Sequence, residues 1–183
     1  MNLQIRVMQE EDISRLGDMD GSFEVDSMLV LSMTDQRIDY TIQPVALYTK
    51  SYNDHDTEEE EEMEETAYIN HPDQIIYLAC LGDRVAGHIT LRRHWNRYAY
   101  VEDIRVDKSI RQMGIGTALI DAAKQWALTG GMPGIMLETQ NNNVVACQFY
   151  EKCGFTIGGF DRLLYQGLGH PHNEIAIYWY LLF

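Results

Sequence analysis

The segment from Arg111 to Thr117 has the residue types and spacing of a phosphate-binding loop. It reads Arg-Gln-Met-Gly-Ile-Gly-Thr and follows an apolar run that ends at Val106. Glycine has no Cβ, so Gly114 and Gly116 can leave the amides of a helix's first turn uncovered. Such amides, with the positive end of the helix dipole, bind phosphate groups. The segment is therefore a candidate anion-binding loop, to which Arg111 can add positive charge.

Two common phosphate loops do not fit this segment. The dinucleotide-binding fingerprint needs a third glycine where this chain has Leu119. A P-loop needs a Gly-Lys-Ser or Gly-Lys-Thr sequence, which is absent. The segment is therefore neither of these two loops.

Residues 98–106, which precede the loop, are predicted to form a strand with an irregularity. Val101 stands at an odd-numbered position, whereas Ile104 and Val106 stand at even-numbered positions. The apolar alternation therefore changes phase between positions 101 and 104. One inserted residue in a β-bulge has this effect. A strand buried on both faces would blur the alternation in a similar way.

The loop leads into a predicted amphipathic helix. Its apolar face recurs at helical spacing and consists of Ile115, Ala118, Leu119, Ala122, Ala123 and Trp126. The opposite face is polar, with Thr117, Asp121, Lys124 and Gln125. Gly130, Gly131 and Pro133 are expected to end the helix.

The rest of the chain supplies elements that can hold these residues. The pattern predicts a strand over residues 3–7, a short helix over 10–16, and strands and loops over 21–52. It further predicts a helix over 54–67, a hairpin of residues 75–81 and 85–91, a parallel strand over 135–138, a helix over 143–153, and final strands over 155–160 and 174–181.

The length of 183 residues predicts a single domain, residues 1–183. The net charge of -14 disfavours a nucleic-acid partner and favours a cationic substrate. Much of the excess acid lies in residues 54–65, where a solvated helix face or a mobile loop is the alternative to substrate contact. No apolar run has membrane-spanning length and no signal-peptide pattern is present, so a cytoplasmic protein without a membrane partner is expected.

Cysteine and histidine patterns do not indicate a metal site. Cys80, Cys147 and Cys153 lack metal-ligand spacing and are expected to stay reduced. The segment His170-Pro171-His172 is interpreted as a loop. No metal is therefore predicted.

A second motif, Asn143-x-x-Ala146-x-x-x-Tyr150, places a small residue and a phenol on one helix face. Together with the loop at 111–116 and the order of strands, it resembles the GNAT family of acetyl-CoA-dependent N-acetyltransferases. The resemblance implies an α/β (α+β) fold: a mixed, mostly antiparallel, twisted sheet with a central parallel strand pair, flanked by helices. It also implies acetyl-CoA as cosubstrate.

The resemblance implies that a free amine attacks the thioester of acetyl-CoA. Glu102, or second Asp103, would remove the amine's proton, and Tyr150 would protonate the leaving thiolate. The alternatives are that Tyr150 only packs and that the two acids are surface-facing or salt-bridged. Cys147 has no evident activating histidine and is not expected to be a nucleophile. The implied cofactor-binding residues are Ile104, Arg105, Val106, Arg111, Gln112, Met113, Gly114, Ile115, Gly116, Thr117, Asn143, Ala146 and Tyr150.

Longer segments resemble streptothricin acetyltransferases, bacterial enzymes that acetylate the β-lysine part of that antibiotic. These segments are residues 23–27, 137–143, 146–155 and 157–161. The resemblance implies streptothricin as the cationic partner, and the candidate substrate-binding acids are Glu24, Asp26, Asp103 and Asp161. The alternatives are an N-acetyltransferase for polyamines or protein amines, and a non-catalytic module that senses acyl-CoA. The oligomeric state is not predicted.

Overall fold

The structure is a computed structural model that describes residues 2–16, 19–51, 65–168 and 173–183. The chain forms two compact units, which are treated separately. The first comprises Met1–Ser22, Ser51–Ile135 and Phe183, and the second Phe23–Lys50 and Met136–Leu182. Most of the helix predicted for residues 54–67, and the His170-Pro171-His172 segment, lie outside the described residues.

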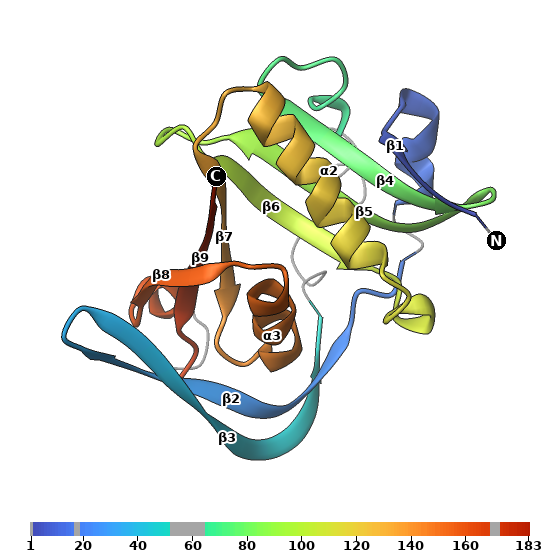
Figure 1. The fold of residues 1–183 in the computed structure, drawn as a ribbon. Coiled ribbons are helices and arrows are strands. Elements are labelled where there is room, and N and C mark those ends of the chain that lie inside the picture. Colours follow the sequence, from blue (N-terminus) through green and yellow to red (C-terminus); the bar gives the residue numbers. More distant parts are fainter. Residues whose placement is uncertain (1, 17–18, 52–64, 169–172) are drawn as a thin grey trace. The chain divides into compact units, whose positions relative to one another are not determined.

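The first unit contains an antiparallel sheet. Its strands are β1 (Leu3–Val7), β4 (Gln74–Leu81), β5 (Arg84–Arg93) and β6 (Ala99–Val106), in that order (Figure 1). Two 3-10 helices, η1 (Glu10–Arg15) and η2 (Lys108–Ile110), connect them to their neighbours. The predicted first strand, short helix and hairpin are confirmed. The tight β4–β5 turn contains Gly82 at φ 63°, which glycine adopts without a Cβ penalty.

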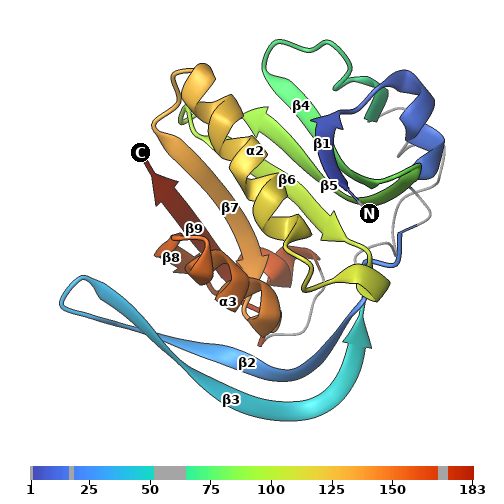
Figure 2. The same cartoon turned by 45° about the vertical axis from the view of Figure 1, so that its right-hand side comes forward.

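Helix α2 (Ile115–Thr129) lies across one face of this sheet (Figures 1 and 2). The predicted helix and its end at Gly130 are confirmed. The predicted apolar face is partly wrong, since Ala118, Ala122 and Trp126 are only half-buried. The residues that are fully packed are Ile115, Leu119, Ile120, Ala123 and Ala127. The helix is apolar over so much of its circumference that periodicity alone does not fix which side meets the sheet.

The second unit contains a smaller sheet and a helix. Its strands are ordered β7 (Gly134–Gln140), β9 (Ala176–Leu182) and β8 (Thr156–Asp161), and β8 and β9 are antiparallel. Helix α3 (Val144–Lys152) and the 3-10 helix η3 (Leu164–Leu168) complete it. Helix α3 ends before Gly154, whose φ is 91°. The predicted second helix and final strands are confirmed.

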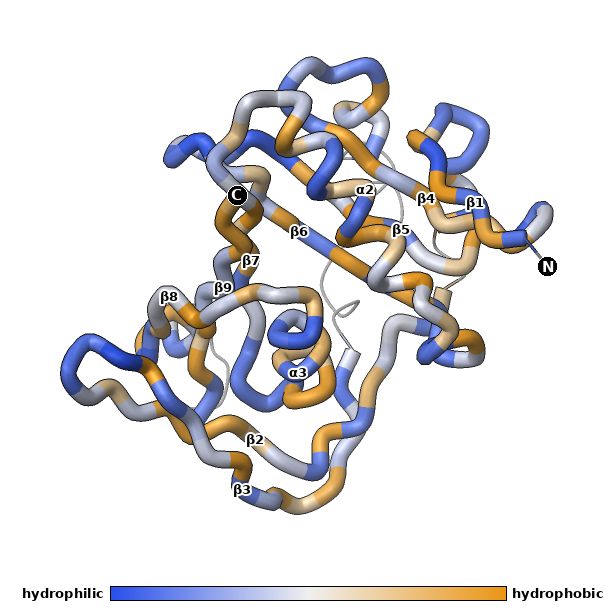
Figure 3. Tube along the Cα trace, viewed as in Figure 1, coloured by the Kyte–Doolittle hydropathy of each residue, from blue (hydrophilic) through white to orange (hydrophobic). Residues whose placement is uncertain are grey.

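A long two-stranded ribbon also belongs to the second unit. Strands β2 (Phe23–Thr34) and β3 (Arg37–Lys50) pair along almost their whole length (Figure 2). Asp35 and Gln36 form the hydrophilic turn with positive φ values, 49° and 65°, as a tight hairpin requires (Figure 3). The Leu29 amide of β2 donates to the carbonyl of Asn141, and the side-chain amide of Asn141 donates to the carbonyl of Leu29. The ribbon is more regular than the strands and loops predicted for residues 21–52.

Candidate active site

Strand β6 contains the predicted β-bulge. Asp103 pairs with Thr90 of β5, whereas Val101 pairs with Leu91, so Glu102 is the additional residue. The phase change in the apolar pattern therefore came from an inserted residue and not from a strand buried on both faces. The bulge places two consecutive carboxylates at an irregular point of the sheet.

Glu102 is engaged by two neighbours in the first unit. Its carboxylate accepts hydrogen bonds from the Tyr68 hydroxyl and from Nε of Arg92. The Arg92 guanidinium also lies 5.0 Å from the centre of the Tyr100 ring. Glu102 is therefore a salt-bridged carboxylate, which was the alternative to its role as a base.

Asp103 is held by two basic side chains. Its Oδ2 atom lies 2.7 Å from Nε2 of His88 and 2.9 Å from Nε of Arg105. Burial opposes ionisation of Asp103, but the hydrogen bonds and charges of His88 and Arg105 outweigh it and hold its pKa below the ordinary value. Such a carboxylate is ionised at neutral pH but has a weak tendency to take up a proton. The roles of Glu102 and Asp103 in the reaction remain predictions.

The predicted phosphate loop has the geometry that an anion needs. Gly114 precedes α2 with φ 80°, and no side chain among the described residues caps the first turn of the helix. The first-turn amides of α2 are thus not covered by a capping side chain. Nε of Arg111 donates to the carbonyl of Val106 (3.0 Å) and Nη1 to that of Ser22 (2.9 Å). Arg111 thus holds the loop in place in addition to carrying charge, and pyrophosphate binding by the loop remains a prediction.

The second motif has a structural function that is visible in the second unit. Oδ1 of Asn143 accepts a hydrogen bond from the amide of Ala146 (3.2 Å) and so caps α3. The Tyr150 side chain is 6% exposed, and its ring packs against those of Phe149, Phe155 and Trp179. The ring of Tyr150 therefore packs in the core, and the role of its hydroxyl in catalysis remains a prediction.

Cys147 lies on α3 and is buried. Burial raises the pKa of its thiol to about 12. The thiol is therefore protonated at neutral pH, as is expected of a residue that does not act as a nucleophile.

The predicted substrate acids are divided between different places. Glu24 and Asp26 line one pocket of about 210 Å³ together with Asn142 and the first turn of α3. Asp161 instead accepts hydrogen bonds from the amides of Leu163 (2.7 Å) and Leu164 at the start of η3. Asp103 belongs to the first unit. The structure thus brings together Glu24 and Asp26 only.

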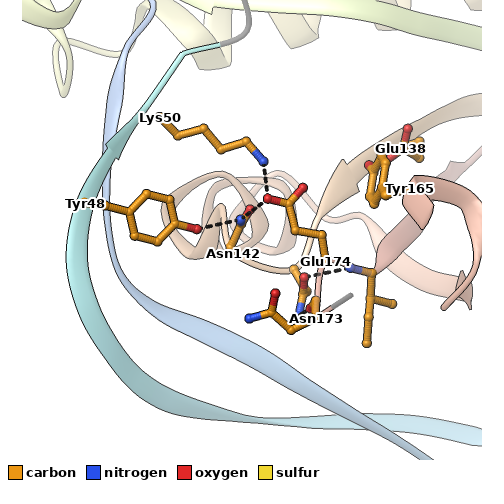
Figure 4. A network of polar contacts seen from close by, with 9 residues as sticks. Tyr48, Lys50, Glu138, Asn142, Tyr165, Asn173 and Glu174 are labelled. Carbon is orange, nitrogen blue, oxygen red and sulfur yellow. Dashed lines mark hydrogen bonds and ion pairs between the residues drawn. The ribbon is translucent and has the colours of Figure 1, made fainter. Parts of the chain in front are cut away.

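A buried polar network in the second unit was not predicted. Nζ of Lys50 lies 2.7 Å from Oε1 of Glu174 (Figure 4). Asn142 donates to the same oxygen (3.1 Å) and to the hydroxyl of Tyr48 (2.9 Å). Because Lys50 and Glu174 are far apart in the sequence, no local pattern signalled their contact.

Glu138 is a second residue that the predicted site omitted. It lies on β7, and its carboxylate accepts a hydrogen bond from the Tyr165 hydroxyl (Figure 4). Burial raises its pKa, against the opposing effects of that hydrogen bond and of the Lys50 charge. A single acid in the otherwise apolar run 134–138 was the signal that could have identified it.

Comparison with known proteins decides the family. The model of the acetyltransferase (GNAT) family matches residues 42–155, which is more than half of the chain. The chain belongs to the GNAT family of acetyltransferases. A streptothricin acetyltransferase from Escherichia coli is 35% identical over 97% of this chain and 95% of its own length. Streptothricin acetyltransferase A from Bacillus subtilis strain 168 is 40% identical over 74% of each chain.

A solved GNAT structure gives the same result. A protein from Bacillus anthracis strain Ames, assigned as a streptothricin acetyltransferase and solved with acetyl coenzyme A, is 52% identical over 100% of both chains, with a TM-score of 0.89. This likeness confirms the predicted fold class and the use of acetyl-CoA. The chain is an acetyl-CoA-dependent N-acetyltransferase.

Two further observations bear on ligands and membranes. In the part of the chain that the structure describes, no group of His, Cys, Asp and Glu side chains could hold a metal ion. No helix among the described residues is long and apolar enough to cross a membrane.

Proposed function

We propose that this GNAT enzyme transfers the acetyl group of acetyl-CoA to an amine in the β-lysine part of streptothricin and thereby gives resistance to the antibiotic. The observation that carries the proposal is the similarity to streptothricin acetyltransferases over almost the entire length of both chains. Charge supports it, because a chain of net charge -14 attracts a cationic substrate. We place the reaction in the cytoplasm, where acetyl-CoA is made.

We propose that the loop at 111–117 holds the pyrophosphate of acetyl-CoA. Gly114 supports this role, because its left-handed conformation starts α2 without a capping side chain over the first-turn amides. Asn143 fixes the start of α3, the helix that carries Ala146 and Tyr150. Acetyl-CoA, when bound, supplies the thioester carbonyl that the amine attacks.

Proton transfer must accompany the attack. An alkylammonium has a pKa of ~10.4 and cannot attack while it is protonated, so a carboxylate must take a proton from it. Glu102 and Asp103 are the carboxylates that the sequence offers for this task. Tyr150 is suited to protonate the thiolate, and a strand amide in residues 104–106 to stabilise the carbonyl oxygen.

We assign the attraction of the substrate first to Glu24 and Asp26, two exposed acids on strand β2. Glu24 and Asp26 share one pocket with Asn142, so two carboxylates can face one ligand there. Their charges would draw a cationic antibiotic toward the second unit. Asp161 and Asp103 remain candidates for contacts elsewhere on the same substrate.

The experiment is a thiol-release assay with acetyl-CoA and streptothricin, followed by mass spectrometry of the antibiotic. The expected product carries one acetyl group on the β-lysine part. Acetylation of another part of the antibiotic would contradict the proposed position. No reaction with streptothricin, combined with turnover of a polyamine or a peptide amine, would overturn the substrate. No turnover of any amine, with acetyl-CoA still bound, would favour an acyl-CoA-sensing module.

A further inference from the structure

Glu138 occupies a different environment from the two acids of the β-bulge. Its carboxylate accepts a hydrogen bond from the hydroxyl of Tyr165, a neutral group. Among the described residues, no basic side chain lies within ion-pair distance of Glu138. Glu102, in contrast, is paired with Arg92, and Asp103 with Arg105. A carboxylate in an ion pair loses that attraction when it takes up a proton, whereas Glu138 does not lose a direct ion pair.

Strand alternation and hydrogen bonds indicate which side chains lie near Glu138. Trp179 of β9 packs against Tyr150, so Trp179 points to the face covered by α3. Side chains alternate along a strand, so Tyr178 points to the opposite face. Asp161 accepts hydrogen bonds from amides at the start of η3, and Tyr165 of η3 donates to Glu138, so both acids lie next to this short helix. After burial, the charges of both acids raise the pKa of Tyr178.

That face offers an ammonium group suitable partners. Asp161 pairs in register with Ala176, two residues from Tyr178, so its side chain lies on the same face as the Tyr178 ring. Carboxylates and the faces of aromatic rings both attract cations. Glu138 is half-buried here, which shields it from bulk water without closing it off.

We propose that Glu138 is the carboxylate that accepts a proton from the substrate amine, and that Tyr165 is a positioning residue that holds it. This inference rests on the proposed function, because it assigns one role in the same acetyl transfer. It gives Glu138 the role that the sequence assigned to Glu102 or Asp103.

The proton balance of the step is complete. Glu138 takes one proton from the ammonium and leaves a neutral amine. The nitrogen then forms a bond to the acetyl carbon while the carbon–sulfur bond breaks. The thiolate takes a proton from Tyr150, and Tyr150 regains the proton that the acylated nitrogen gives up. Glu138 finally releases its proton to water, so one proton is produced for each acetyl group transferred.

The electrostatics of Glu138 agree with this role. Burial raises the pKa of the carboxyl group, and a base whose pKa lies closer to the working pH is more effective. The hydrogen bond from Tyr165 and, to a smaller extent, the charge of Lys50 stabilise the ionised form and limit this rise in pKa. Removal of the Tyr165 hydroxyl should therefore raise the pKa of Glu138.

The test measures kcat and kcat/KM against pH for the wild type, Glu138→Gln and Tyr165→Phe, with acetyl-CoA and streptothricin. Glu138→Gln should lower kcat by ~10²–10⁴ without changing the affinity for acetyl-CoA. Tyr165→Phe removes the hydrogen bond that lowers the pKa of Glu138, so the acidic limb of kcat/KM should move to higher pH. Activity should persist on the alkaline side of that limb.

The matched control is Glu151→Gln. Glu151 also accepts a hydrogen bond from a tyrosine, since Tyr40 Oη lies 3.0 Å from its Oε2, but it is exposed on α3. Its pH profile should match that of the wild type. Glu102→Gln and Asp103→Asn are measured in parallel, and both should retain an acidic limb.

Four outcomes separate the possibilities. Wild-type kcat and an unmoved acidic limb in Glu138→Gln would overturn the inference, as would loss of the limb in Glu102→Gln or Asp103→Asn. If Glu138→Gln does not fold, an unmoved limb in Tyr165→Phe would overturn it. If the wild type does not acetylate streptothricin but acetylates spermidine or lysine, the proposed function fails. The same variants then test the role of Glu138 with that amine.

Discussion

The ammonium of Lys50 lies 2.7 Å from the carboxylate of Glu174, and the two side chains are only 13% and 6% exposed. This ion pair joins the last residue of β3 to a residue just before β9. Asn142 donates a second polar contact to the same carboxylate oxygen. This buried ion pair, with Asn142 as a further hydrogen-bond donor, holds the end of the β2–β3 ribbon in place within the second unit.

Removing one member of this pair should strongly destabilise the protein. Lys50→Met leaves the Glu174 charge buried without its cation, which is expected to cost about 3–5 kcal/mol in the free energy of unfolding. The double variant Lys50→Met/Glu174→Met should recover much of that loss. Arg37→Met is the control, because its ion pair with Asp39 is exposed and should contribute about 0–1 kcal/mol. Chemical denaturation checks all three, and equal losses in Lys50→Met and Arg37→Met would contradict the account.

Stability at acid pH should depend on Asp12. Arg6 donates two hydrogen bonds to the buried Asp12 carboxylate, and they lower its pKa despite the opposing effect of burial. A carboxylate with a lowered pKa stabilises the fold above its unfolded pKa of ~3.9, and this contribution is lost as the pH falls through the folded pKa. Asp12→Asn should be less stable at neutral pH and lose less stability on acidification. Parallel losses in both proteins, measured by denaturation from pH 7 to 2, would exclude this role.

The phosphate loop can be tested with two glycines that share a conformation. Gly114 and Gly82 have φ values of 80° and 63°, and an added Cβ would meet no atom within 4 Å at either. Gly114→Val and Gly82→Val should therefore carry similar backbone strain. Only Gly114→Val should weaken acetyl-CoA binding, by tenfold or more, because the loop would no longer present its amides. Calorimetry measures both affinities, and an unchanged affinity in Gly114→Val would remove the loop from the site.

The hydroxyl of Tyr150 can be separated from its ring. Tyr150→Phe keeps the packing against Phe155 and Trp179 and deletes one polar atom. Loss of general-acid help should lower kcat by ~10²–10⁴, while the affinity for acetyl-CoA stays the same. Steady-state kinetics and calorimetry check the two parts. Turnover at the wild-type rate would show that this tyrosine only packs.

Local patterns predicted the elements well. The parity change between Val101 and Ile104 predicted a bulge, because one inserted residue reverses every following side chain, and the strand register places that residue at Glu102. Glycines marked the start and end of α2, because their conformations are required there. The buried face of α2 was less certain, since Ile120 and Ala127 compete with Ala118 and Trp126 for the sheet.

The environment of each acid could not be predicted in the same way. One partner of Asp103 is Arg105, two residues further along the same strand. The other is His88 on β5, and this contact depends on the strand register. The contact between Lys50 and Glu174 joins residues separated by 124 positions. The hydrogen bond between Glu138 and Tyr165 likewise depends on where η3 packs. Sequence shows which acids are present, whereas tertiary packing decides which are paired with arginine.

The central claim is tested most directly by the catalytic efficiency of acetyl transfer to different amines. Thiol release from acetyl-CoA is measured with streptothricin, spermidine, lysine and a peptide with a free amino terminus, at one salt concentration and pH. The account predicts the highest kcat/KM for streptothricin, with the acetyl group on its β-lysine part. A higher kcat/KM for spermidine, lysine or the peptide would contradict the proposed substrate.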